Sequence, residues 1–298
     1  MDSGLLLIDK PEGPSSAQVV SKVKVLTGAK KVGHLGTLDP FASGLLLLGI
    51  NEGTKIADIF LGAAKSYRGV MVLGVETDSQ DATGNVVQIR QVPAIGPAEL
   101  QRLEQEFSGD LQQVPPMFSA LKRGGVPLYK LAREGKEVPR EPRSITIATL
   151  RLKKLERDEI AVEVTCSRGT YVRTLAADMG KSLGCGAHLK SLRRVACGHL
   201  TVDRAVTLDA LGRLDSKRSF PLLRLEKALE HLRAITWENR RLSQLRLGQQ
   251  EILAHAGKPV AGEKLVRILD SRGSLVALVE WHEDLPGGRW RLLRLFKQ

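Results

Sequence analysis

The chain has 298 residues, of which 42 % are hydrophobic; it can bury a core in one large domain plus a small one, or in two medium ones, and is not generally disordered. Lysine and arginine total 45 against 33 acidic residues, and the net charge of +12 favours a polyanionic partner over the alternative of a merely basic surface. Because only 4 % of the residues are aromatic, the composition favours recognition of a folded nucleic acid over an extended base-stacking platform.

The sequence contains no apolar run of the roughly 18 to 20 residues that span a membrane, and its start, "MDSGLLLIDKPEG", does not form a signal peptide. We therefore expect a soluble, cytoplasmic protein. Its cysteines, Cys166, Cys185 and Cys197, are widely spaced and form no C-x-x-C pair. This spacing predicts three buried free thiols and no metal site.

The first 50 residues predict a strand, a helix and a second strand. "LLLID" followed by "KPEGPSS" is typical of a strand and a turn. Ser15 or Ser16 can cap a helix that runs to about Leu26 and ends at Gly28. The near-continuous apolar run "GLLLLGI", residues 44–50, predicts a strand that is covered on both faces.

The middle of the chain alternates regular elements with one irregular segment. Residues 66–87 predict a long strand, an acidic hairpin turn and a return strand, and residues 96–109 predict a helix. Residues 113–143 combine prolines, glycines and cations, with periodicity only in the short helix "YKLAREG". Because long loops on compact scaffolds are functional or disordered, we expect a basic flap that contacts the polyanion.

The remaining elements predict a second, smaller unit at the end of the chain. Residues 144–167 predict a pair of alternating strands, and residues 168–198 a strand end, a helix, a glycine stop and the basic segment "KSLRR". From residue 233 onward, a helix or turn precedes several short strands with glycine turns. This pattern predicts a small β-barrel appended to the larger domain.

The motif "VGHLGTLDPFASGLLLLG" places one carboxylate, Asp39, directly in front of a core strand. Pro40 restricts Asp39 to an extended backbone, and the nearby glycines allow sharp turns and a close ligand. A carboxylate held at a strand terminus is suited to catalysis. The alternative is an Asx-turn, in which Asp39 only closes the loop.

Two further segments contain candidate site residues. In "SRGTYVRTLAADMG", a strand would place Tyr171 and Arg173 on one face, where the arginine could orient Asp39 bidentately and keep it ionised. The alternative is an arginine paired with a structural acid. Tyr67 alternates in phase with Met71, which by itself favours a core position. Asp78 and Asp81, in the same segment as Tyr67, favour a hairpin turn over a metal loop.

Together, "LLLIDKPEGPSS", "GHLGTLDPFASGLLLLG", "KSYRGVMVLGVETDSQDATG", "PPMFSALKRGGVPLYKLAREG" and "SRGTYVRTLAADMGKSLGCGAHLKSLRR" resemble the TruB-type tRNA pseudouridine synthases. The resemblance covers about residues 4–200 in the expected order, and more loosely the C-terminal unit, which resembles a PUA-like RNA-binding module. It implies an α+β fold: a mixed, largely antiparallel central sheet with flanking helices and a basic insertion, residues 113–143. The implied domains are residues 1–232, catalytic, and 233–298, PUA-like.

The resemblance also implies residue roles. Asp39 matches the catalytic aspartate, Tyr67 the tyrosine that stacks on the target base and can help move its C5 proton, and Arg173 the arginine that pairs with the aspartate. His34 matches a histidine that packs among the T-loop bases, and Tyr171 a neighbour in the pocket. Further substrate contacts are implied at positions in the matching segments: Lys10, Gly33, Gly36 and Leu192. The sequence departs from the family pattern at Ser79 and Phe118, where threonine and tyrosine are common.

The implied reaction is isomerisation of uridine to pseudouridine at position 55 in the T-loop of tRNA, by a monomer that needs no cofactor and no obligatory protein partner. A flipped base and a single carboxylate meet its demands, by attack at C1′ or by removal of a C2′ proton. Three alternatives are a non-catalytic tRNA-binding or RNA-folding protein, whose activity can coexist with catalysis, a guide-RNA-dependent synthase, and a glycoside hydrolase. Asp39, Tyr67 and Arg173 together favour the catalytic T-loop synthase over these alternatives. Deletion of residues 236–298 is expected to weaken tRNA binding more than bound-state chemistry.

Overall fold

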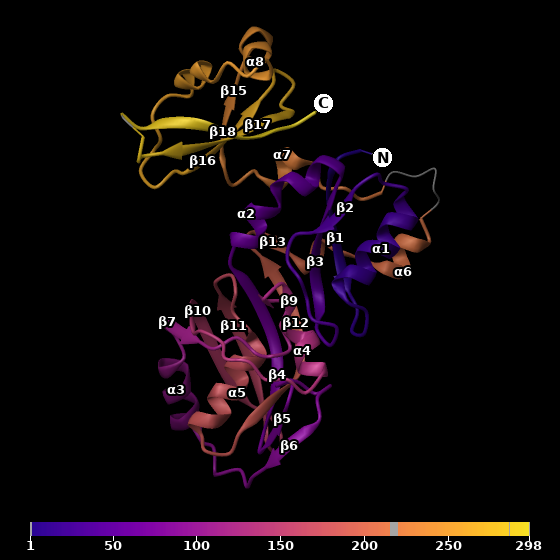
Figure 1. Ribbon diagram of the computed structural model, residues 1–298, viewed down its shortest axis with the longest axis vertical. Helices are drawn as coiled ribbons and strands as arrows, with labels where there is room; N and C mark the ends of the chain where they lie inside the picture. The colour runs from indigo at the N-terminus through magenta and orange to yellow at the C-terminus, as the bar shows by residue number, and fades with distance from the viewer. Residues whose placement is uncertain (1, 215–219, 286, 298) are drawn as a thin grey trace.

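The computed structural model describes residues 2–214, 220–285 and 287–297, and these residues form an elongated molecule with the C-terminal module at one end (Figure 1). The main feature is a 10-stranded sheet in the order β14-β1-β3-β12-β4-β11-β10-β7, with β2 paired to β3 and β13 to β12. Its strands are β1 (Gly4–Lys10), β2 (Val32–His34), β3 (Ser43–Ile50), β4 (Lys65–Leu73), β7 (Gly109–Gln113), β10 (Arg143–Lys154), β11 (Glu159–Cys166), β12 (Ala187–Cys197), β13 (Leu200–Thr201) and β14 (Val206–Thr207).

The pairing in this sheet is mixed and largely antiparallel, as predicted. Within the described part of this sheet, only β1 with β14 and β3 with β12 run parallel. β4 and β12 pair along most of their lengths at the centre, with two register shifts in β12. The segment "KSLRR", predicted only as a basic stretch, is therefore part of a central strand.

Helices cover the sheet and connect its strands. α1 (Ser16–Thr27) begins at Ser15, which forms a capping box with Gln18, and ends at Gly28, so the predicted cap and stop are both confirmed. The other helices of this part of the chain are η1 (Asn51–Ile56), α2 (Ala57–Gly62), α3 (Pro97–Glu106), α4 (Leu128–Arg133), α5 (Val172–Ser182), η2 (Val202–Arg204), α6 (Leu208–Gly212) and α7 (Leu225–Ala228).

Two short hairpins flank the helices. β5 (Val75–Thr77) pairs with β6 (Val86–Ile89), which confirms the predicted acidic hairpin turn between them. β8 (Lys122–Arg123) pairs with β9 (Val126–Pro127) inside the basic segment, residues 113–143, and α4 follows directly, which confirms the predicted short helix.

β3 is covered on both faces, as its apolar run predicts. Leu46 and Leu48 belong to one core, which includes α1, α5 and the inner face of β10 and β11, and Leu45 and Leu47 belong to a second core on the opposite face. Because strand side chains alternate between faces, a run of four leucines can serve both cores only as a strand between two layers.

The C-terminal module is a four-stranded sheet in the order β15-β16-β17-β18. Its elements are β15 (Arg233–Thr236), α8 (Asn239–Arg246), η3 (Gln250–Ala256), β16 (Leu265–Leu269), β17 (Leu275–His282) and β18 (Arg289–Leu295). The strands are where the sequence predicts them, but in the described residues β15 and β18 remain at the two edges, so the predicted barrel is not closed.

The two parts of the molecule share buried surface. Leu275, Leu278 and Phe296 of the C-terminal module belong to the second core beneath β3, whereas Trp237 and Trp290 belong to a third core inside the module. All three cysteines are buried, as predicted. No helix among the described residues is long and apolar enough to cross a membrane.

Candidate active site

The loop between β2 and β3, residues 35–42, presents Asp39 just before the start of β3. Gly36 has φ 141°, a conformation that other residues rarely adopt, and turns the chain after β2. At the other end of the loop, Gly44 lies so close to the backbone of Arg194 in β12 that a side chain would collide with it. The predicted role of glycine in this motif is therefore local: one glycine makes a turn and another allows close strand packing.

Anchors from three distant segments fix this loop. Ser16, at the start of α1, accepts a hydrogen bond from the Leu38 amide and donates to its carbonyl, both at 2.8 Å. Arg194 is buried and donates to the carbonyls of Leu45, Thr37 and Gly36 at 2.7, 3.2 and 3.1 Å. The loop therefore has a single conformation imposed by α1 and β12.

Lys10, for which a substrate contact is predicted, is the third anchor of the loop. Its side chain is fully buried at the end of β1, and its ammonium donates to the carbonyls of Pro11, Pro14 and Pro40 at 2.7, 2.9 and 3.2 Å. With all three donors used, Lys10 holds the residue after Asp39. Burial lowers the pKa of Lys10 to about 8.

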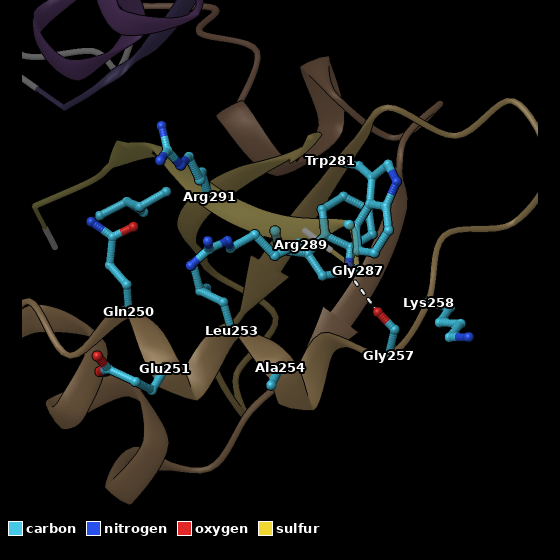
Figure 2. A pocket seen from close by; sticks show the side chains of 13 residues that line it. Gln250, Glu251, Leu253, Ala254, Gly257, Lys258, Trp281, Gly287, Arg289 and Arg291 are labelled. Carbon is cyan, nitrogen blue, oxygen red and sulfur yellow. Dashed lines mark hydrogen bonds between the residues drawn. The ribbon is translucent and has the colours of Figure 1, made fainter. Parts of the chain in front are cut away.

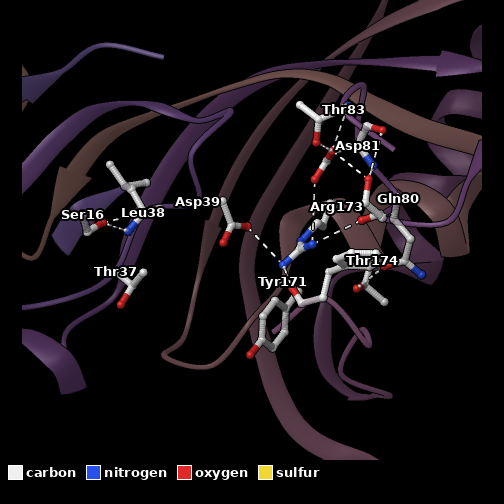
Figure 3. Close-up of polar contacts among 12 residues, drawn as sticks. Ser16, Thr37, Leu38, Asp39, Gln80, Asp81, Thr83, Tyr171, Arg173 and Thr174 are labelled. Atoms are coloured by element: carbon white, nitrogen blue, oxygen red, sulfur yellow. Dashed lines mark hydrogen bonds and ion pairs between the residues drawn. The ribbon is translucent and has the colours of Figure 1, made fainter. Parts of the chain in front are cut away.

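Asp39 pairs with Arg173, as predicted, but not bidentately. Arg173 Nη2 lies 3.2 Å from Asp39 Oδ2, and the arginine side chain is only 5 % exposed while that of Asp39 is 37 % exposed (Figure 3). The predicted strand at Arg173 is also wrong, because α5 begins at Val172 and Arg173 lies in its first turn. The carboxylate bonds to Arg173 and forms no Asx-turn bond within the described residues, which favours the catalytic alternative.

The other side of the Arg173 guanidinium faces the β5–β6 turn and the basic segment. Nη1 lies 3.8 Å from Oδ2 of the buried Asp81 and donates to the Ser79 carbonyl at 3.2 Å, while Nη2 donates to the Phe118 carbonyl at 2.5 Å. Both family departures, Ser79 and Phe118, contact Arg173 through backbone carbonyls. A changed side chain at either position therefore leaves this contact in place.

Burial and the neighbouring charges shift the pKa of Asp39 in opposite directions. Burial raises the pKa of Asp39 above its usual range, the Arg173 charge opposes this, Asp81 raises the pKa further, and Lys10 lowers it. The direction is upward, so Arg173 limits the effect of burial without abolishing it. Burial also raises the pKa of Tyr67 to about 12, so its phenol is protonated at neutral pH.

Two adjoining cavities meet at the Asp39–Arg173 pair. The smaller, about 260 Å³, is lined by Tyr67, Tyr171 and Leu192 together with the pair. The larger, about 740 Å³, is lined by His34 and by Tyr129 and Arg133 of α4. Residues common to both are Thr37, Leu38, Asp39, Ser119, Ala120 and Arg173. One carboxylate therefore serves a small aromatic chamber and a wider polar one.

Comparisons with known proteins agree with this geometry. A model for "TruB family pseudouridylate synthase (N terminal domain)" matches residues 24–172, and one for "tRNA pseudouridylate synthase B C-terminal domain" matches residues 173–235. The tRNA pseudouridine synthase B of Stutzerimonas stutzeri is 42 % identical over 98 % of this chain and 96 % of its own length. The chain belongs to the TruB family. The enzyme of the same name from Geobacter sulfurreducens is 41 % identical over 98 % of this chain and 99 % of its own.

Solved structures support the TruB-family fold. A Cbf5-Nop10-Gar1 complex aligns with a TM-score of 0.68 at 25 % identity, covering 93 % of this chain and 78 % of that one. An H/ACA RNP bound to a substrate RNA containing 2′-deoxyuridine aligns with a TM-score of 0.67 at 22 % identity, covering 93 % and 77 %. At this identity the second likeness shows the fold alone.

Most residues for which the TruB resemblance implies roles line one of the two cavities. Asp39, Tyr67, Tyr171, Arg173, Gly36 and Leu192 line the smaller cavity, and His34 lines the larger one. The described lining of these two cavities does not include Gly33, which lies in β2 opposite Gly49 of β3. Its predicted substrate contact has no support from the cavity geometry.

The sequence predicts no role in the site for three of its residues. It predicts a turn at Asp81, a basic segment at Arg194 and a loop at Ser119. Ser119 is buried, lines both cavities, and its hydroxyl has no hydrogen-bond partner within the described residues. A cation within an alternating strand such as Arg194 is the one signal available in the sequence; Asp81 and Ser119 acquire their places only through tertiary contacts.

Proposed function

We propose that this chain isomerises uridine to pseudouridine in the T-loop of tRNA, at position 55. The observation that supports this most strongly is a single carboxylate, Asp39, paired with a buried arginine at the junction of two cavities in a TruB-family chain. The net charge of +12 suits a polyanionic substrate.

The target uridine enters the smaller cavity only after leaving its base stack, because chemistry at C1′ and C5 cannot take place inside a stacked loop. Tyr67 from β4 and Tyr171 from the start of α5 supply aromatic surfaces, and Leu192 supplies an apolar one. Flat side chains of this kind hold a uracil while it rotates. The protonated Tyr67 phenol lies in the wall, where it can stack on the base.

Asp39 performs the covalent or proton-transfer step. In one route its carboxylate attacks C1′, the N1–C1′ bond breaks, the uracil turns over, and C5 displaces the carboxylate. In the other it removes a C2′ proton, which leaves a glycal to which C5 adds. In the glycal route Asp39 then returns its proton to C2′. Either route ends with loss of the proton from C5 and gain of one at N1, so no atom is gained or lost overall and no redox partner is needed. Arg173 favours the ionised carboxylate that both routes require.

The larger cavity receives the rest of the T-loop. His34 lies there with an unpartnered, buried Nδ1, and burial together with Arg194 lowers its pKa, so a neutral imidazole meets the bases. The basic segment, residues 113–143, contributes Phe118, Tyr129 and Arg133 to the same walls. Seven lysines and arginines against three glutamates in this segment suit contacts to phosphates.

Several broader features belong to the same proposal. Residues 1–232 act as the catalytic domain, and residues 233–298 as a PUA-like RNA-binding domain whose strands form a sheet here. The enzyme works in the cytoplasm as a monomer, without a metal, cofactor or obligatory protein partner. It can also assist tRNA folding, because the same cavities and charges bind the T-arm.

The test compares wild type with Asp39→Asn on an unmodified tRNA transcript. Carbodiimide labelling followed by primer extension detects pseudouridine, whose formation does not change the mass of the RNA. We expect a stop at the T-loop uridine with wild type alone, and similar tRNA affinity for both proteins. Tight binding by both without any stop would instead support the second candidate, a tRNA-binding or folding protein, and refute the catalytic proposal.

A further inference from the structure

The C-terminal module contains a third cavity, of about 690 Å³, built from elements that do not contribute to the Asp39 site. η3 forms one wall, and β17 and β18 form the other (Figure 2). The indole N–H of the buried Trp290 donates to the Gly257 carbonyl at 2.6 Å, which ties β18 to the end of η3. The cavity is therefore a fixed feature of the module.

An aromatic ring is available in this cavity. Trp281 lies at the end of β17 and lines the cavity, and it contacts Trp290 edge-on, with ring centroids 5.2 Å apart and an interplanar angle of 66°. In contrast to Trp290, Trp281 is only half-buried. Trp290 and Gly288 contact parts of the Trp281 ring, and the remaining half-exposed part lines the cavity, where it can meet another planar group.

Cations without protein partners surround the ring. Arg289 and Arg291 are exposed on the same side of β18, and Lys258 follows η3; none of them forms an ion pair or side-chain hydrogen bond with the described residues. Other arginines of the module are engaged: Arg233 with Glu263, and Arg294 with Asp58. The lining thus concentrates free positive charge, with Glu251 as its one described acid.

We propose that this cavity binds an unpaired nucleotide of the tRNA substrate, with the base stacked on Trp281 and the flanking phosphates on Arg289 and Arg291. An aromatic face beside two free guanidinium groups suits a planar ring joined to a phosphate backbone. This inference rests on the proposed function, since it assigns to the same RNA a second contact remote from the reacting uridine. Its consequence is that a full-length tRNA is bound at two places and an isolated T-arm at one.

The experiment measures binding and turnover of full-length tRNA and of an isolated T-arm stem-loop by the whole chain. The variants are Arg289→Ala/Arg291→Ala and Trp281→Ala, with Trp281→Phe as a variant that keeps a ring. Arg246→Ala/Lys264→Ala is the matched control, because it removes two exposed charges from the same module outside this cavity. Free nucleoside monophosphate is the competitor.

We expect both alanine variants to raise KM for full-length tRNA on the order of tenfold, and Trp281→Phe and the control to stay near wild type. The double arginine variant should also reduce the slope of log affinity against log salt by roughly 1.4, for two phosphates of a single strand, whereas Trp281→Ala should leave the slope unchanged. The KM for the isolated T-arm divided by the KM for full-length tRNA should therefore fall in these variants.

An equal loss with the control variant would overturn the proposal, since it would show a general charge effect. So would an equal loss with the T-arm, or free monophosphate that leaves tRNA binding unaffected. If Trp281→Ala does not fold, the exposed arginine pair still decides the question. A wild type that binds tRNA through this cavity but forms no pseudouridine would refute the proposed function and support the cavity.

Discussion

Asp81→Asn is a selective test of the charge network behind Asp39. Asp81 Oδ1 accepts hydrogen bonds from Ser79 Oγ and from the Thr83 amide and hydroxyl at 2.8, 3.0 and 2.5 Å, and an asparagine oxygen can accept the same three. The turn should therefore persist, while Arg173 loses the carboxylate 3.8 Å from its Nη1. The change removes a charge and retains the shape.

The expected effect follows from this distance. Unit charges 3.8 Å apart interact by about 4 kcal/mol at an effective dielectric constant of about 20. Arg173 keeps Asp39 and two backbone carbonyls as partners, so only part of this energy should be lost from its orientation. We expect a loss of about 1.4 to 3 kcal/mol of transition-state stabilisation, which corresponds to a roughly 10- to 150-fold slower single-turnover rate.

The pH profile separates orientation from charge. Because the charge of Asp81 raises the pKa of Asp39, Asp81→Asn should lower the pKa of Asp39. The acid limb of the pH–rate profile should then move to lower pH, while the maximal single-turnover rate on the plateau falls. Asp78→Asn is the matched control: Asp78 lies in the same turn, bonds to the Asn85 amide and side chain, and does not contact Arg173. A plateau within about twofold of wild type, or an equal loss with Asp78→Asn, would refute the reasoning.

Three other predictions follow from the same site. In wild type, single-turnover rates should fall as pH drops through the pKa of Asp39, which burial raises above the usual 3.8. A pH–rate profile whose acid limb has its midpoint below 3.8 would contradict the burial argument. Lys10→Met should lower the free energy of unfolding in urea by about 2–4 kcal/mol because three carbonyls lose their donor, whereas the exposed Lys22→Met should change it by less than about 0.5 kcal/mol. Ser119→Ala should change stability by less than about 0.5 kcal/mol, since no hydrogen bond of its hydroxyl meets normal geometry within the described residues. It should raise KM or lower the rate by roughly 2- to 12-fold if the hydroxyl bonds the flipped nucleotide; unchanged kinetics would exclude that contact.

Local signals predicted most elements, and their failures have a common physical cause. Ser15 and Gly28 predicted both ends of α1 because the cap and the stop are made within the helix itself. The start of α5 was missed because Tyr171 is not a capping residue: its amide donates to the side chain of Gln113, 58 positions away, at 2.8 Å. The partner that ends the strand and begins the helix is invisible to a local pattern.

The site divides in the same way. Asp39 is recognisable beside Pro40 because the local backbone fixes its direction, and the family resemblance adds its partner, Arg173. The residues that balance the charge of the site cannot be recognised in this way. Asp81 and Arg194 belong to a turn and a strand whose sequences show that these positions are polar, but not that they lie beside Arg173 and the Asp39 loop. The open sheet of the C-terminal module follows this rule too, since alternation predicts strands but not which edges pair.

The shared core changes what truncation of the C-terminal module can test. Leu275, Leu278 and Phe296 pack into the same cluster as Leu45 and Leu47 of β3, the strand that begins just after the Asp39 loop. Deletion of residues 236–298 would uncover this face of β3, so a loss of chemistry would report a damaged catalytic sheet as readily as a lost RNA contact. Surface changes at Arg289 and Arg291 leave the core intact. They can therefore separate RNA binding by the module from its support of the strand next to Asp39.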